Sequence, residues 1–123
     1  MKVGDGRGFV VERHEYRFVI TVSHCLPYLP PCHLAAYLEE KPYGGLLGPI
    51  DGDKPVICAE CLFVDPVNDL AIFGTPDDQE LCEQADLYQE FTEAAVPIRI
   101  REAKKGETIW VLNFNGGVQV ACG

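Results

Sequence analysis

The fold is decided by the stretch Tyr16-Arg17-Phe18-Val19-Ile20-Thr21-Val22-Ser23-His24-Cys25. Its first seven residues are mainly aromatic or β-branched, which is the composition of a β-strand. The short apolar run Phe9-Val10-Val11 precedes it, and the polar residues Arg13-His14-Glu15 lie between the two. The sequence therefore predicts a β-hairpin whose second strand delivers His24 at its end.

Three glycines, Gly4, Gly6 and Gly8, come just before this hairpin. Glycine is favoured where one stretch of backbone must pass close to another. We therefore expect the backbone to pass close to another stretch of backbone here, where the chain enters the sheet.

Two further strands are expected in the middle of the chain. Val56 to Val64 is mostly apolar, as in a strand that is buried on both faces. Asp65-Pro66-Val67-Asn68 then breaks the run, because proline fixes φ while Asp and Asn favour turns. The apolar run resumes from Asp69 to Phe73, which predicts a second strand.

The C-terminal residues predict more β-structure. Pro97 to Arg101 is an expected strand, and Lys104-Lys105-Gly106 an expected turn. Thr108 to Phe114 is the next strand, and Asn115-Gly116 is typical of a type I′ hairpin turn. Val118 to Ala121 should therefore pair back onto the strand before it.

Two segments differ from this pattern. Leu26 to Lys54 is rich in proline and glycine and is expected to be mostly loop, with only His33 to Glu40 suited to a helix or a strand. Thr75 and Pro76 suit the N-cap and first position of a helix that ends before Pro97. The residues expected on its buried stripe are Leu81, Ala85, Tyr88 and Ala95.

These elements predict a mainly β fold. The 123 residues suit one domain, 1–123, which we expect to be a single small antiparallel β-barrel with one inserted acidic helix around 76–95. The helix is acidic because seven carboxylates lie between Asp77 and Glu93, where there is no Lys or Arg.

Charge and hydropathy exclude some classes of partner. The formal net charge of −9 disfavours nucleic acids and anionic membrane surfaces, which would repel the chain. No apolar run reaches the roughly 20 residues that span a bilayer. The first residues also lack the apolar segment of a secretory signal, which favours the cytoplasm and reduced thiols for the six cysteines.

His24 and Asp69 are the candidate catalytic residues. A histidine at the end of an apolar strand is held in one orientation, as a general base requires. Asp69 stands directly before the apolar run Leu70-Ala71-Ile72-Phe73, so it is expected to be partly buried and in need of a donor. An imidazole N–H would satisfy it, and the carboxylate would then fix the imidazole tautomer. His14, in the turn, and His33, in the loop, are expected at the surface.

The motifs around these two residues resemble those of trypsin-like serine peptidases. Gly6-Arg7-Gly8-Phe9-Val10-Val11 followed by Phe18 to Leu26 is similar to the family's pattern that ends in its catalytic histidine. Asp65 to Phe73 is similar to the family's Asp-Pro and Asp-Leu-Ala signature, whose second aspartate orients that histidine. The stretch Gly106 to Gly117 resembles the segment that crosses toward a second barrel.

The resemblance implies a serine endopeptidase that cleaves peptide bonds with a Ser-His-Asp triad and needs no cofactor. His24 would be the base and Asp69 its orienting carboxylate. The chain would be the first barrel of the family's double barrel, its partners being a protein or peptide substrate and a C-terminal barrel that these residues do not contain.

This sequence departs from the family pattern at the nucleophile. Ser23 is the only serine, and it lies inside the histidine motif where the family has a small residue, so no nucleophile is assigned. Cys122-Gly123 is similar to the nucleophile context of viral cysteine relatives, but Cys122 lies too close to Asp69 in sequence for that role. The chain alone is therefore expected to be inactive as a peptidase.

A small zinc-binding domain or a non-catalytic peptide-interaction domain is the alternative. Cys58 and Cys61 have the spacing of a zinc knuckle, and Cys25, Cys32 and His33 are further possible ligands. Residues three apart on a strand point to opposite faces, however, so the first two thiols should diverge and no metal site is assigned.

Overall fold

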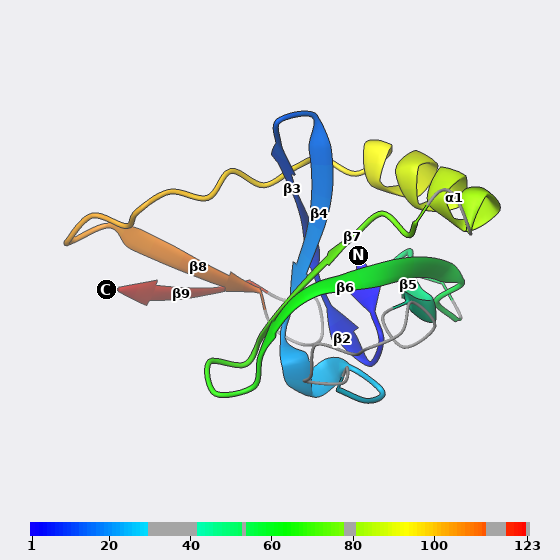
Figure 1. The fold of residues 1–123 in the computed structure, drawn as a ribbon. Coiled ribbons are helices and arrows are strands. Elements are labelled where there is room, and N and C mark those ends of the chain that lie inside the picture. Colours follow the sequence, from blue (N-terminus) through cyan, green and yellow to red (C-terminus); the bar gives the residue numbers. More distant parts are fainter. Residues whose placement is uncertain (30–41, 53, 78–80, 113–117, 123) are drawn as a thin grey trace.

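The computed structural model describes residues 1–29, 42–52, 54–77, 81–112 and 118–122. Its barrel strands are β1 (Lys2–Val3), β2 (Gly6–Arg7), β3 (Phe9–Arg13), β4 (Tyr16–Thr21), β5 (Pro42–Gly48), β6 (Ile57–Asp65) and β7 (Leu70–Gly74). They form one antiparallel sheet in the order β2-β1-β5-β6-β7-β4-β3. The sheet curls into a nearly closed barrel with one helix, α1 (Cys82–Glu93), beside it (Figure 1). The expected mainly β fold, a single small barrel with one inserted helix, is confirmed.

The barrel closes at Gly8. β2 and β3 are the two ends of the sheet, yet they follow one another in the chain through this residue. The Gly8 N–H donates to the Met1 carbonyl at 3.0 Å, so the bend is tied to the first strand. A Cβ at Gly8 would lie 2.8 Å from the Ile20 carbonyl oxygen, which leaves no space for a side chain. The expected close approach of backbone to backbone is confirmed here.

The predicted first hairpin is confirmed as β3 and β4. Their register runs from Phe9↔Ile20 to Arg13↔Tyr16. His14 and Glu15 connect them with positive φ values of 51° and 69°, as a type I′ turn requires.

The middle strands are confirmed with one correction. β6 and β7 pair through Asp65↔Leu70 across the predicted turn. β6 is buried from Ile57 to Ala59, but Leu62 and Phe63 are about half exposed, so the expectation of burial on both faces is wrong for its second half. The reason is that β5 pairs with β6 only as far as Glu60, and beyond that point β7 is the only described strand that pairs with β6.

The expectation of a loop over Leu26 to Lys54 is wrong for β5. Pro42 is tolerated because it is the first residue of the strand. The register shifts between Tyr43 and Leu47, and Gly45 has φ +61°, so the glycines form an irregularity in the strand and do not end it. Tyr43, Leu46 and Leu47 are buried in the core. His33 to Glu40 lies outside the described residues.

The core of the barrel is apolar and contiguous with the helix. Its members with the lowest exposure are Val3, Val10, Val19, Tyr43, Leu47, Ala59, Ala71, Phe73 and Tyr88.

The helix is confirmed but is shorter than predicted. It begins at Cys82 rather than at Pro76, which is buried and lies outside the helix. Ala85 and Tyr88 lie on its buried face as expected, together with Thr92. The helix packs against β6 and β4.

Arg17 of β4 fastens the C-terminal end of the helix to the sheet. Its Nη1 donates to the carbonyls of Thr92 at 2.7 Å and Ala95 at 3.2 Å, at the end of the helix where carbonyls lack the regular i+4 donor. The Tyr88 hydroxyl donates in return to the Arg17 carbonyl at 2.7 Å.

The C-terminal segment forms a separate two-stranded sheet of β8 (Thr108–Leu112) and β9 (Val118–Cys122), which points away from the barrel in Figure 1. Its pairing, with Leu112↔Val118, is the predicted one, while Asn115-Gly116 lies outside the described residues. The predicted strand at Pro97 to Arg101 is wrong, since this segment forms no ladder and its backbone bonds to the barrel only from Ile98 N–H to the Val10 carbonyl, among the described residues. Among the described residues, no helix has the length and apolar character to span a membrane.

Candidate active site

His24 lies in a short 3₁₀ turn, η1 (Ser23–Cys25), that follows β4 directly. The turn is closed by bonds from Cys25 N–H to the Val22 carbonyl at 3.3 Å and from Leu26 N–H to the Ser23 carbonyl at 3.2 Å. The preceding strand is buried at Val19 and Thr21, so it gives the turn a rigid base. The imidazole itself is 70% exposed.

Asp69 is positioned by the turn between β6 and β7. The Asp65 carboxylate accepts bonds from Val67 N–H at 3.0 Å and from Asn68 N–H at 3.2 Å, and from the Asn68 side-chain amide at 2.6 Å. These bonds lower the pKa of Asp65, the Asn68 side chain being the largest cause. Asp69 follows with φ +56°, a left-handed conformation that aspartate tolerates better than most residues.

The two candidate residues are in direct contact. His24 Nδ1 faces Asp69 Oδ2 in a short hydrogen bond, and the His24 backbone N–H donates to Asp69 Oδ1 at 2.8 Å. The Ser23 hydroxyl donates to the same Oδ1 at 2.9 Å. Both turns lie at the same end of the barrel in Figure 1, the first in cyan and the second in green. The expectation that an imidazole N–H would satisfy Asp69 therefore agrees with the structure, while the Ser23 bond was not foreseen from the sequence.

The electrostatics of the pair favour an ionised Asp69. The pKa of Asp69 lies below its ordinary value, first because of the His24 backbone N–H, then the His24 ring, with the Ser23 hydroxyl contributing less. An ionised carboxylate at Nδ1 keeps a proton on that nitrogen, so the lone pair of the neutral imidazole is on Nε2. Nε2 is on the opposite edge of the ring, and no described residue forms a hydrogen bond with it. This arrangement can accept a proton or attack an electrophile.

The described residues around His24 offer no activated nucleophile. Ser23 is 5% exposed, and its hydroxyl proton is directed to Asp69 and not to the imidazole. The Cys25 thiol has a raised pKa, chiefly from burial, which disfavours the reactive thiolate. Cys122 is at the end of β9 in the separate sheet, paired with Thr108.

The turn that carries His24 rests on the loop between β1 and β2. Asp5 N–H donates to the Cys25 carbonyl at 3.3 Å. Gly4, with φ +53°, passes so close that a Cβ there would lie 2.4 Å from the same oxygen. Gly6 faces the Cys25 sulfur, which a Cβ would approach to 2.3 Å. The glycines noted in the sequence therefore support the backbone directly after His24.

An open hollow of about 440 Å³ lies beside the pair. Its apolar wall is made of Leu26, Tyr28, Leu29 and Pro66, and its polar part of Ser23, His24 and Asp69.

Tyr43 holds the Tyr28 part of this wall in place. Its hydroxyl donates to the Tyr28 carbonyl at 2.8 Å, and the two rings stack with centroids 4.5 Å apart. Tyr43 packs edge-on against Phe73 as well, and burial raises its pKa. This role was not predictable from the sequence, because Tyr43 lies next to glycines in a segment predicted to be loop.

The alternative zinc ligands do not assemble among the described residues. Cys58 is buried and Cys61 half-buried on β6, and the thiols of Cys25, Cys58, Cys61 and Cys82 are free. No group of three or more His, Cys, Asp or Glu side chains within the described ranges could hold a metal ion. Cys32 and His33 lie outside those ranges.

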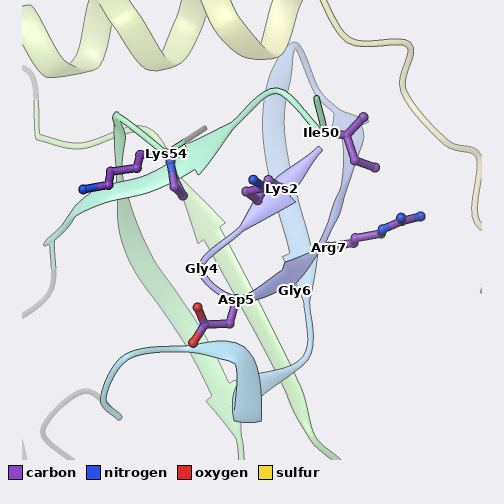
Figure 2. A pocket seen from close by; sticks show the side chains of 8 residues that line it. Lys2, Gly4, Asp5, Gly6, Arg7, Ile50 and Lys54 are labelled. Atoms are coloured by element: carbon purple, nitrogen blue, oxygen red, sulfur yellow. The ribbon is translucent and has the colours of Figure 1, made fainter. Parts of the chain in front are cut away.

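A second hollow, of about 450 Å³, carries three of the ten cationic side chains. Figure 2 shows Lys54 and Arg7 pointing away from one another on opposite sides of it. The Lys2 ammonium donates to the Gly52 carbonyl at 2.7 Å. The charges do not converge on one point, so we prefer the hollow beside His24 as the functional site.

No family model, curated protein or solved structure matches the chain.

Proposed function

We propose that this chain carries the histidine and aspartate of a trypsin-like serine endopeptidase and lacks the nucleophile. The observation that supports this most is the way His24 is held. Its ring and its backbone N–H both bond to the carboxylate of Asp69, from a turn that a β-strand delivers. In a Ser-His-Asp triad the aspartate has this role: it fixes the tautomer of the base and stabilises the imidazolium that forms.

The rest of the reaction requires groups that the described residues do not supply. Peptide-bond cleavage needs a hydroxyl within reach of Nε2 and donors for the developing oxyanion. The hydroxyl of Ser23 is bonded to Asp69. We therefore assign general acid and base catalysis to His24 and orientation to Asp69, and place the nucleophile in a second barrel. That barrel would also hold the oxyanion donors and the pocket that selects the substrate.

The test uses the complete reading frame that contains this chain. We expect it to continue past Gly123 into a serine in a Gly-x-Ser-Gly-Gly context, and a fluorophosphonate probe to label that serine. In the His24→Ala protein, labelling should slow by about 10³-fold or more, because the serine loses its base. The 123-residue chain alone should remain unlabelled and should not cleave peptides.

Two results would contradict the proposal. One is a complete frame without such a serine. The other is a labelling rate that His24→Ala leaves unchanged. His14→Ala is the matched control, because His14 is an exposed histidine in the β3–β4 turn, outside the hollow beside His24.

A further inference from the structure

The His24–Asp69 pair has the chemistry of a nucleophile in its own right. Asp69 holds Nδ1, so the free lone pair of the neutral ring is on Nε2. The imidazole is 70% exposed, which leaves that nitrogen accessible to a small molecule. Histidine is among the side chains that form covalent intermediates in hydrolysis.

We propose that this pair, without any serine, hydrolyses neutral aryl esters of short apolar acids, with His24 Nε2 as the nucleophile. The inference requires only described residues and does not depend on a second barrel.

The reaction balances with water as the second reactant. The Nε2 lone pair attacks the acyl carbon, an N–C bond forms, and the C–O bond breaks so that the aryloxide leaves with its electron pair. The acylated ring is cationic, and the Asp69 carboxylate at Nδ1 stabilises it. Water then attacks the acyl carbon, the N–C bond breaks with its electrons returning to Nε2, and the carboxylate is released while both protons of the water go to solvent.

The hollow sets the class of substrate. Its volume of about 440 Å³ lies in the range of small-molecule sites. Leu26, Tyr28, Leu29 and Pro66 give it an apolar wall that favours an uncharged acyl or aryl group. Tyr43 fixes part of that wall through its bond and stacking with Tyr28. Amides are excluded as substrates because an amine leaves poorly without oxyanion donors or a positioned acid.

The experiment follows the release of nitrophenolate from p-nitrophenyl acetate and p-nitrophenyl hexanoate by the folded chain. The rate is read after more than twelve equivalents of product, because the six cysteines, five lysines and N-terminal amine could each be acylated once and together release that amount. We expect His24→Ala to lower kcat/KM by about 10²-fold or more, because the variant has lost the nucleophile. His14→Ala, the matched exposed histidine, should keep the wild-type rate.

Two further variants test the parts of the site. Asp69→Asn should lower kcat and move the ring proton from Nδ1 to Nε2, which the ¹⁵N shifts of His24 report independently of activity. Leu29→Ala should reduce the preference for hexanoate over acetate several-fold, since Leu29 is half exposed in the apolar wall. Circular dichroism confirms that each variant is folded.

The inference is overturned if His24→Ala and wild type turn over at the same rate, or if His14→Ala loses as much activity as His24→Ala. It is supported if only the His24 and Asp69 variants lose turnover. These results are separate from those of the fluorophosphonate test, so either proposal can fail while the other stands.

Discussion

Gly4 lies against the backbone that follows His24, and replacing this glycine should destabilise the fold through two distinct effects. Gly4 has φ +53°, and an alanine Cβ there would lie 2.4 Å from the Cys25 carbonyl oxygen. The left-handed conformation costs an alanine about 1–2 kcal/mol, and overpacking against the rigid backbone about 1–3 kcal/mol. We expect Gly4→Ala to lower the free energy of unfolding by about 2–5 kcal/mol, a large part of the total for a domain of this size.

Two other glycines separate these effects. Gly106 has φ +84°, and no described atom lies within 4 Å of its Cβ position. Gly106→Ala should therefore lower the free energy of unfolding only by the cost of the left-handed conformation, about 1–2 kcal/mol. Gly44 has an ordinary φ and equally open space, so Gly44→Ala should be neutral or stabilise by up to about 1 kcal/mol.

Urea unfolding followed by far-ultraviolet circular dichroism measures all three free energies. If Gly4→Ala costs no more than Gly106→Ala, the contact with the Cys25 carbonyl does not restrict the chain and the reasoning is refuted. The ¹⁵N shifts of His24 provide a second measurement. They should change in Gly4→Ala, because the displaced carbonyl belongs to the residue after His24, and stay unchanged in Gly106→Ala.

The remaining predictions concern the helix and the carboxylate. Tyr88→Phe should lower the free energy of unfolding by about 1–3 kcal/mol, because the buried Tyr88 hydroxyl bonds to the Arg17 carbonyl at 2.7 Å. Tyr16→Phe is the control: this tyrosine is 68% exposed, and its replacement should change the free energy of unfolding by less than about 0.5 kcal/mol. Equal effects of the two variants in urea titrations would contradict a stabilising role of the Tyr88 hydrogen bond. The pKa of Asp69 is lowered by folding, so its stabilisation is complete above the ordinary pKa of an aspartate and is lost as the pH falls through the lowered value. Asp69→Asn should therefore show a weaker loss of unfolding free energy between neutral and acidic pH than wild type, and an identical pH dependence would count against the hydrogen bonds.

Local sequence was sufficient wherever neighbours in the chain decide the structure. The β3–β4 hairpin follows from two apolar runs on either side of a short polar turn, and the turn before Asp69 follows from Asp65 and its backbone bonds. The prediction from local sequence was wrong at β5, where Pro42 and several glycines indicated a loop. Pairing with β6 and burial of Tyr43 overcome that local preference. The helix begins later than its capping residues indicated, and Pro76 is buried in the core instead of at a helix start.

The candidate site divides in the same way. The sequence by itself determined which residues could act, since a strand that ends at His24 and a turn that ends at Asp69 are local features. Only the tertiary structure decided that they meet, because β4 and β7 are neighbours in the sheet although 45 residues separate the two side chains. The tertiary structure also decided that the Ser23 hydroxyl donates to Asp69, and that the Tyr43 hydroxyl donates to Tyr28 in the wall of the hollow. The physical reason is that hydrogen bonds and packing across a closed sheet depend on register and distance in space, which no single stretch of sequence contains.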